Sequence, residues 1–369
     1  MQLADLEYFY IAKEMSGRFM GSRIGKIYQV TSRLFKVQVS NEDGKFTLLI
    51  QLPDYITSTK REIPSPEQPS NFIMALRKRL TNGVIDNIEQ PGFERILIFS
   101  ITSHGKHYKL VIELFSNGNI ILCDADHNNV IDVIYRRESW RGRELRKGVP
   151  YLFPPSKTSP FSIEPRHITL HGKKTLMAGI LSQVAVAPKY LEEAFVRAGI
   201  DPRSEREPNA EDKERLLYMI KGVCAEGNYY IYKKDGKLVD YSVAHLTKYE
   251  SSEYEKIKFK SVLEMVDTIY EPALSEDDTD AGAAETEEHR KLALAKVKER
   301  LAGLETKERN ARASAAYIHR NYHNIDQMIH LVRQLKKQGR SEHEISKALS
   351  HIEKNARYKD GMIIIKIKC

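Results

Sequence analysis

A pair of oppositely charged residues follows a tight turn and precedes an apolar run. In EQPGFERILIF, residues 89–99, Pro91 and Gly92 predict a turn, and Glu94 and Arg95 stand before a strand-like segment. A carboxylate can accept hydrogen bonds from an exocyclic amine or a 2′-hydroxyl, and a guanidinium can donate two bonds to a base edge or a phosphate. The pair is therefore a candidate RNA contact, and the alternative is an ion pair that fixes a strand end.

Arginine-rich stretches are a second set of candidates. In RRESWRGRELRK, residues 136–147, arginines surround the only tryptophan of the chain, and further cations lie in a predicted helix over residues 71–83. Arginine beside an aromatic ring suits phosphate contact and base stacking, whereas the alternative is a solvated basic loop. The candidates for these contacts are Arg77, Lys78, Arg136, Arg137, Trp140, Arg141 and Arg143.

Motifs of the common enzyme classes do not occur in the sequence. It contains no Walker phosphate loop, GxGxxG, GxSxG or HExxH. His319 and His323 have the spacing of two zinc ligands, but without a flanking Glu or Cys the pattern favours polar residues on a helix surface. The three cysteines are widely spaced and odd in number, which argues against a disulfide framework. We expect a protein without catalytic activity, metal or cofactor.

Charge and hydropathy limit the partners. The 369 residues include 58 basic and 50 acidic ones, and the net charge of +8 favours anionic partners such as nucleic acid without naming one. The N-terminal segment MQLADLEYFYIAKEM lacks the basic start of a signal peptide. No apolar run approaches the roughly 20 residues that span a bilayer. We expect a cytoplasmic protein outside the membrane.

The hydrophobic pattern predicts an α+β protein of several domains. Alternating apolar runs over residues 22–50 and 84–124 predict strands, with hairpin signals at Asn41–Gly44 and at Asn117–Gly118. A Pro-rich segment then marks a boundary, and residues 168–223 have helical spacing. Within the helical part, VAVAPKYLEEAF resembles a helix-hairpin-helix. Ala185 and Ala187 stand where such turns carry the glycines that let the backbone approach a phosphate, so the segment favours structural packing over phosphate binding.

The last third of the chain changes character. Residues 271–288 contain eight acidic residues and no basic one, which predicts a flexible linker. Apolar side chains then recur at alternating steps of 3 and 4 over residues 294–332, a coiled-coil seam of about 58 Å at 1.5 Å per residue. The remaining segments, a short helix with a Ser341–Glu344 capping box and a strand, look too small to cover this seam. We therefore expect a truncated coiled coil, or a seam that pairs with another molecule.

Four stretches of the sequence resemble stretches that occur in the same order in the NFACT family. Members of this family act on the large ribosomal subunit in quality control, and in bacteria they are known as fibronectin-binding protein A. The four stretches are PSNFIMALRKRLTNGVIDNIEQPGFERILIFSI, YKLVIELFSNGNIILCD, GVPYLFPP and VAVAPKYLEEAFVRAGID. The resemblance implies a glycosylase-like, β-rich N-terminal domain, a small helix-hairpin-helix domain and an antiparallel coiled-coil segment. The expected parts are an N-terminal domain (1–167), a helix-hairpin-helix domain (168–227), a β-hairpin with a connecting helix (228–270), an acidic linker (271–288) and a coiled-coil region (289–369).

The resemblance also implies a function. Family members bind the large ribosomal subunit that carries a stalled peptidyl-tRNA and recruit aminoacyl-tRNA, from which the ribosome adds a template-free tail. An Asp-Arg pair after the QPG turn takes part in tRNA recognition together with an Asp of the first helix, and the matching positions here are Glu94, Arg95 and Asp5. Glutamate keeps the carboxylate of the family's aspartate and lengthens its reach by one methylene. The expected partners are tRNA and ribosomal RNA.

Two alternative functions remain open. The likeness to DNA glycosylases allows a DNA-binding protein, although the start Met1, Gln2, Leu3 lacks the proline nucleophile of those enzymes and no cysteine set for their zinc finger occurs. The bacterial family name suggests binding to the extracellular matrix protein fibronectin. That function requires export, and the sequence shows no signal peptide.

Overall fold

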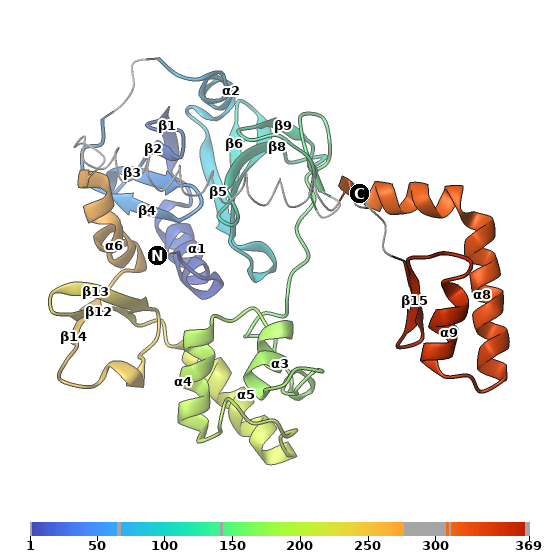
Figure 1. Cartoon of the computed structure of the whole chain (residues 1–369). Helices are drawn as coiled ribbons and strands as arrows, with labels where there is room; N and C mark the ends of the chain where they lie inside the picture. The colour runs from blue at the N-terminus through green and yellow to red at the C-terminus, as the bar shows by residue number, and fades with distance from the viewer. Residues whose placement is uncertain (1, 65–67, 141–142, 277–307, 310, 366–369) are drawn as a thin grey trace. The chain divides into compact units, whose positions relative to one another are not determined.

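A computed structural model describes residues 2–64, 68–140, 143–276, 308–309 and 311–365. The chain divides into two compact units, Met1–Ala273 and Leu274–Cys369. The first unit holds a large antiparallel sheet, a group of helices and a small second sheet (Figure 1). The second unit is a small helical body with one β-hairpin.

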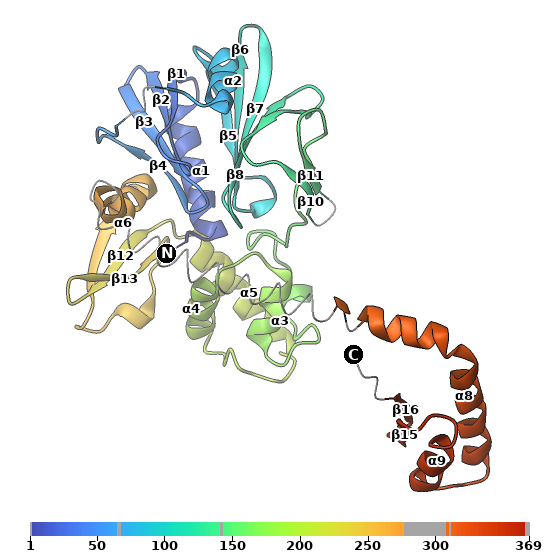
Figure 2. The ribbon, with the colours of Figure 1, turned by 45° about the horizontal axis from the view of Figure 1, so that its top comes forward.

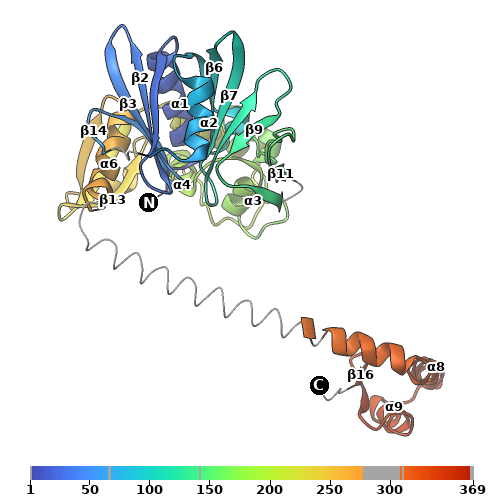
Figure 3. The same ribbon diagram turned by 90° about the horizontal axis from the view of Figure 1, so that it is seen from above.

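A nine-stranded sheet with the order β4-β3-β2-β1-β5-β6-β7-β8-β9 forms the N-terminal domain. Its strands are β1 (Arg23–Gln29), β2 (Leu34–Asn41), β3 (Gly44–Gln51), β4 (Tyr55–Thr59), β5 (Val84–Glu89), β6 (Ile96–Ser103), β7 (Lys106–Glu113), β8 (Asn119–Asp124) and β9 (Val130–Val133). Neighbouring strands are antiparallel, and β1 meets β5 through the single pair Arg23 and Val84. The sheet thus divides into two halves, and Figure 3 shows helices α1 (Asp5–Phe19) and α2 (Asn71–Leu80) between them.

The predicted hairpins of this sheet are confirmed. Asp43 N–H donates to Asn41 Oδ1 at 3.0 Å in the turn between β2 and β3. Between β7 and β8, Gly118 has a φ of +70° and a Cβ there would lie 2.8 Å from Leu52 Cβ, so this turn position requires glycine. The strands β6, β7 and β8 are buried along most of their length, which matches their nearly continuous apolar runs.

The helical group follows the large sheet in the chain. It consists of α3 (Leu176–Gln183), α4 (Pro188–Ala198) and α5 (Ala210–Ala225), and the side chains of Thr175 and Asn209 cap α3 and α5. A three-stranded sheet, β13-β12-β14, comes next with β12 (Tyr229–Lys234), β13 (Lys237–Ser242) and β14 (Glu255–Phe259). The helix α6 (Val262–Glu276) follows β14, so residues 271–276 of the predicted linker are helical, and 277–288 lie outside the described residues.

Figure 2 shows α4 and α5 at the N-terminal end of α1. The contact includes a hydrogen bond of 2.7 Å that Tyr10 Oη in α1 donates to the carbonyl oxygen of Cys224 in α5.

A small hairpin, β10 (Arg137–Trp140) and β11 (Arg143–Leu145), follows β9. Short 3₁₀ turns lie at η1 (Pro91–Phe93), η2 (Pro165–His167) and η3 (Thr247–Tyr249). Of the helices in the described part of the chain, none is both long and apolar enough to cross a membrane.

The second unit covers part of the predicted seam. Residues 311–320 are helical, and α8 (Tyr322–Lys337), α9 (Glu342–Leu349), β15 (Ala356–Lys359) and β16 (Met362–Ile365) follow. The apolar core of this unit consists of Met328, Val332, Ile345, Leu349, Ala356 and Tyr358. The expectation that the last helix and strand could not cover the seam is thus wrong for its C-terminal end, because α9 and the hairpin fold back onto α8. Ile318 and Tyr322 stay exposed at 52% and 70%, and residues 294–307 lie outside the described ranges.

The Ser341–Glu344 capping box is confirmed, with Ser341 N–H donating to Glu344 Oε2 at 3.0 Å.

Candidate nucleic-acid interface

The loop that carries Glu94 and Arg95 is a rigid turn between β5 and β6, and we call residues 90–95 the Gln90 turn. Gly92 has a φ of +60° and Phe93 a φ of +54°, and Glu94 N–H donates to the carbonyl oxygen of Pro91 at 3.2 Å. The Phe93 ring is buried, with its centroid 5.8 Å from that of Phe9 in α1. This aromatic contact pins a backbone that non-glycine residues rarely adopt.

Gln90 joins this turn to the beginning of α1. Its Nε2 donates to the carbonyl oxygen of Asp5 at 2.8 Å and to that of Glu94 at 2.9 Å. Two segments that lie 85 residues apart in the sequence are thereby held side by side. The three residues that sequence reasoning assigned to tRNA, Asp5, Glu94 and Arg95, therefore meet at one place in the fold.

The three side chains interact electrostatically. Burial raises the pKa of Asp5 to about 6, and the nearby charge of Arg95 opposes that shift. Burial and the Asp5 carboxylate raise the pKa of Glu94 to about 7, again against the effect of Arg95. Both carboxyl groups thus titrate close to neutral pH, so each can accept a hydrogen bond when ionised and donate one when protonated.

Arg95 is partly exposed and makes no ion pair within 4 Å in the part of the chain that the structure describes. The alternative interpretation of Glu94 and Arg95, an ion pair that fixes the strand end, is therefore not what the structure shows. What fixes the strand end is the backbone, because Leu114 N–H donates to the carbonyl oxygen of Arg95 at 2.8 Å. The charge of the guanidinium still acts on both neighbouring carboxyl groups, because it lowers the pKa of Asp5 and of Glu94.

Lys157 is a fourth member of this cluster that sequence reasoning missed. The backbone and the charge of Lys157 lower the pKa of Glu94, and the charge also lowers the pKa of Asp5. Its exposed side chain donates from Nζ to the carbonyl oxygen of Leu181 at 2.6 Å. The segment passes close to the turn, because a Cβ on Gly92 would lie 3.3 Å from Ser156. The only signal in the sequence is the Pro-Pro-Ser-Lys run, which predicts a domain boundary and no RNA contact.

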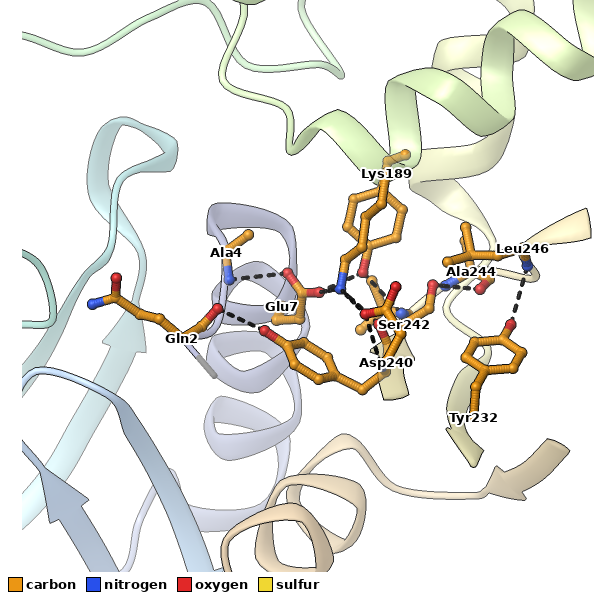
Figure 4. Close-up of polar contacts among 12 residues, drawn as sticks. Gln2, Ala4, Glu7, Lys189, Tyr232, Asp240, Ser242, Ala244 and Leu246 are labelled. Atoms are coloured by element: carbon orange, nitrogen blue, oxygen red, sulfur yellow. Dashed lines mark hydrogen bonds and ion pairs between the residues drawn. The ribbon is translucent and has the colours of Figure 1, made fainter. Parts of the chain in front are cut away.

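A buried polar cluster fixes α1 from the other side, and sequence reasoning also missed it. Glu7 is fully buried, and its Oε1 accepts from Tyr190 Oη and lies 2.9 Å from Lys189 Nζ (Figure 4). Lys189 Nζ also donates to the carbonyl oxygen of Tyr241 at 2.6 Å, and Tyr241 Oη donates to that of Gln2 at 2.6 Å. This cluster joins α1, α4 and β13, and it determines where Asp5 lies.

The same cluster bears on the predicted helix-hairpin-helix. Ala185 is buried and Ala187 precedes α4, so the turn lacks glycines as the sequence indicated. Lys189 in the first turn of α4 points to Glu7 within the protein. The geometry agrees with a packing role for this hairpin.

Among the predicted basic candidates, the structure contradicts Arg143. This side chain is 5% exposed, and its Nη2 donates to Oε1 of the fully buried Glu113 at 2.6 Å. Its Nε donates to the carbonyl oxygen of Leu152, also at 2.6 Å. The residue is a structural ion-pair partner at the start of β11, because an arginine can remain buried when its charge is paired.

The other basic candidates differ in accessibility. Arg136 and Lys78 are exposed, whereas Arg137 is half-buried in β10. Arg77 donates from Nε to the carbonyl oxygen of Ile27 at 2.8 Å and lies 4.9 Å from the ring of Tyr28, so it supports the contact between α2 and β1. Arg141 and the side chain of Trp140 lie outside the described residues. In the described ranges, no three His, Cys, Asp or Glu side chains gather as metal ligands.

The family model for NFACT N-terminal and middle domains matches residues 9–364, nearly the whole chain. The chain belongs to the NFACT family.

Named relatives agree with this NFACT assignment. The archaeal Rqc2 homolog aRqcH of Methanocaldococcus jannaschii is 28% identical over all of this chain and 58% of its own length. The Rqc2 homolog RqcH of Bacillus subtilis is 31% identical over 51% of this chain and 36% of its own length. The human ribosome quality control complex subunit NEMF is 32% identical over 32% of this chain and 11% of its own length. The chain thus spans little more than half of the archaeal relative and a smaller share of the other two.

Solved structures share the NFACT fold seen here. The fibrinogen binding protein from Staphylococcus aureus covers 72% of this chain and 98% of its own, with a TM-score of 0.60 and 19% identity. The N-terminal part of the fibronectin/fibrinogen-binding protein from Streptococcus suis gives a TM-score of 0.59 at 18% identity over 73% of this chain and 100% of its own. At these identities the likeness shows the fold alone. The expected α+β architecture with a large β-rich N-terminal domain is confirmed.

Proposed function

We propose that this NFACT protein holds tRNA at the Gln90 turn, on a large ribosomal subunit that carries a stalled peptidyl-tRNA. In this role it recruits aminoacyl-tRNA, and the ribosome uses that tRNA to add a template-free tail to the nascent chain. The observation that carries the proposal is the meeting of Asp5, Glu94 and Arg95 in one cluster, where Gln90 bonds to Asp5, 85 residues away in the sequence, and to Glu94. The family membership of the chain and the names of its relatives support the ribosomal setting.

The chemistry of the cluster suits an RNA ligand. The Arg95 guanidinium is unpaired in the described part of the chain and can form two parallel hydrogen bonds to a base edge or a phosphate. The carboxyl groups of Asp5 and Glu94, with pKa values of about 6 and 7, can accept from amines or 2′-hydroxyls or donate to a ring nitrogen. Lys157 adds a positive charge beside them for the RNA backbone.

Arg95→Ala tests the site directly. Loss of a charge-assisted, bidentate contact is expected to weaken tRNA binding by roughly 10- to 100-fold, whereas the melting temperature stays within a few degrees because the side chain makes no ion pair in the described structure. The matched control is Lys106→Ala, an exposed cation at the start of β7. If tRNA affinity survives Arg95→Ala unchanged, Arg95 is not a tRNA contact.

The setting is tested by crosslinking the full-length protein to nucleic acid in cells. We expect recovery of tRNA and of large-subunit ribosomal RNA. Recovery of DNA instead would favour the alternative of a DNA-binding protein on a glycosylase-like fold. Binding to fibronectin is not proposed, because the fibronectin/fibrinogen-binding protein from Streptococcus suis shares only the fold with this chain.

A further inference from the structure

An aromatic side chain stands exposed on the segment that runs past the Gln90 turn. Phe153 is 47% exposed and its neighbour Leu152 is 55% exposed, whereas the other phenylalanines of the described ranges are buried or half-buried. We call residues 152–158 the Phe153 segment, and Figure 1 shows it in green where the chain passes from the large sheet to α3. A single exposed apolar residue is common on protein surfaces, but this one is held rigidly and lies on the same segment as a cation.

Hydrogen bonds fix the backbone before Phe153. The carbonyl oxygen of Asn128 accepts from the Tyr151 N–H at 2.8 Å, and its Nδ2 donates to the Tyr151 carbonyl oxygen at 2.7 Å. The buried Arg143 donates from Nε to the carbonyl oxygen of Leu152 at 2.6 Å. A proline follows Phe153, and the residue before a proline is largely confined to extended backbone. Phe153 therefore has little freedom at its backbone.

The Phe153 ring contacts a buried neighbour and keeps an open face. Its centroid lies 5.1 Å from that of Tyr151, and the two ring planes meet at 89°. Tyr151 is buried, and its Oη donates to Oε1 of Glu113 at 2.9 Å, so the ring under Phe153 is itself fixed. An edge-to-face contact covers at most one face of a ring, so at least one face of Phe153 stays clear of Tyr151. The open face is preorganised for a flat ligand, because neither the backbone nor the supporting ring must be ordered on binding.

The other end of the Phe153 segment reaches the tRNA site. A Cβ on Gly92 would lie 3.3 Å from Ser156, and Lys157 lies close enough to Glu94 for its charge to lower the pKa of that carboxyl group. Phe153 and Lys157 are four residues apart, so their Cα atoms are separated by at most about 14 Å. The segment thus places an aromatic face near a cation, the combination with which proteins hold unpaired bases and their phosphates.

We propose that Phe153 stacks on an unpaired base of the RNA held at the Gln90 turn, while Lys157 contacts the RNA backbone. This inference rests on the proposed function and adds to it the part of the RNA that is recognised, a single-stranded stretch. The bases of a duplex are stacked on one another, whereas an unpaired base can turn outward and stack on an aromatic side chain. Every base has a π-face, so this contact selects for an unpaired base and tolerates its identity.

The fluorescence of a base analogue tests the stacking on the full chain. The probe is a short single-stranded uridine oligonucleotide with one central 2-aminopurine, whose fluorescence falls when this base stacks on an aromatic ring. We expect the wild-type chain to quench the probe, Phe153→Leu to lose the quenching and Phe153→Trp to keep it. Leucine retains an apolar side chain but has no ring, so the two variants separate stacking from a general apolar contact. Equal quenching by wild type and Phe153→Leu, or no quenching by wild type, overturns the proposal.

Binding of tRNA separates this inference from the proposed function. Phe153→Leu is expected to weaken tRNA binding about tenfold and to leave its salt dependence unchanged, because the substitution removes stacking and no phosphate contact. Tyr218→Leu, which replaces an aromatic residue that is 74% exposed on α5, is the matched control and should bind tRNA as wild type does. Thermal melting confirms that each variant is folded.

The two proposals fail separately. If Arg95→Ala loses tRNA affinity whereas Phe153→Leu keeps it, the stacking inference is wrong and the proposed function stands. If the wild-type chain quenches the probe in a manner that depends on Phe153 but tRNA does not displace the probe, the stacking site stands and tRNA is not its ligand.

Discussion

Gln90 donates a hydrogen bond of 2.8 Å to the backbone carbonyl oxygen of Asp5, and through it the first turn of α1 is held against the turn that presents Glu94 and Arg95. The same Nε2 atom reaches the carbonyl oxygen of Glu94 at 2.9 Å. One amide group therefore sets the spacing between the two carboxyl groups of the proposed tRNA site.

Replacing Gln90 by leucine should loosen this site. The change removes two hydrogen bonds at similar volume, which is expected to lower the free energy of unfolding by about 1–3 kcal/mol and to weaken tRNA binding. Urea denaturation and filter binding measure the two effects. Asn87→Ala in the preceding strand β5, which removes an exposed contact to Glu89, is the control and should change stability by about 0.5 kcal/mol or less. Unaltered tRNA affinity in a destabilised Gln90→Leu would show that the spacing is unimportant.

The raised pKa of Glu94 predicts a pH-dependent stability. The pKa of Glu94 rises from 4.5 to about 7 in the folded protein. Between these two pH values the folded state therefore keeps a proton on Glu94 that the unfolded state has already released. The stability due to this proton is fully present at acidic pH and is lost as pH rises through about 7. Glu94→Gln should therefore raise the melting temperature at pH 8 and have little effect at pH 5. An equal effect of the substitution at both pH values contradicts the assigned pKa.

Lys157→Gln tests the cation that the tertiary structure adds to the site. A lysine that contacts RNA phosphate contributes about one unit to the slope of log affinity against log salt. We expect the slope for tRNA binding to fall by about one in this variant and to stay unchanged in Lys106→Gln. A wild-type slope in Lys157→Gln would assign Lys157 to the packing against Leu181 alone.

Arg143 is expected to matter for stability and not for RNA contact. Arg143→Met leaves the fully buried Glu113 carboxylate without its cation, which should cost about 3–5 kcal/mol in urea denaturation. The double variant Arg143→Met/Glu113→Leu should recover most of that loss, because neither charge then remains buried. Weaker RNA binding by Arg143→Met with normal stability would restore the surface role that the sequence suggested.

Local sequence patterns determine much of the secondary structure of this protein. Strand alternation, the Asn-Gly turn before β8 and the helix over 71–80 follow from the properties of near neighbours, so they could be predicted. The Pro-Gly turn with Glu94 and Arg95 was also visible, since it is a contiguous segment. The prediction of a linker is wrong at residues 271–276, which belong to α6.

Only the tertiary structure decided which distant residues meet. Whether an arginine is a surface contact or a buried partner depends on what lies across from it, and Arg143 meets a glutamate 30 residues away. The links from Gln90 to Asp5 and from Glu7 to Tyr190 join segments separated by 85 residues or more. Sequence periodicity reports which face of an element is buried, but it does not encode the partner. For that reason the residue types of the site were predictable, whereas its fourth member Lys157 was not.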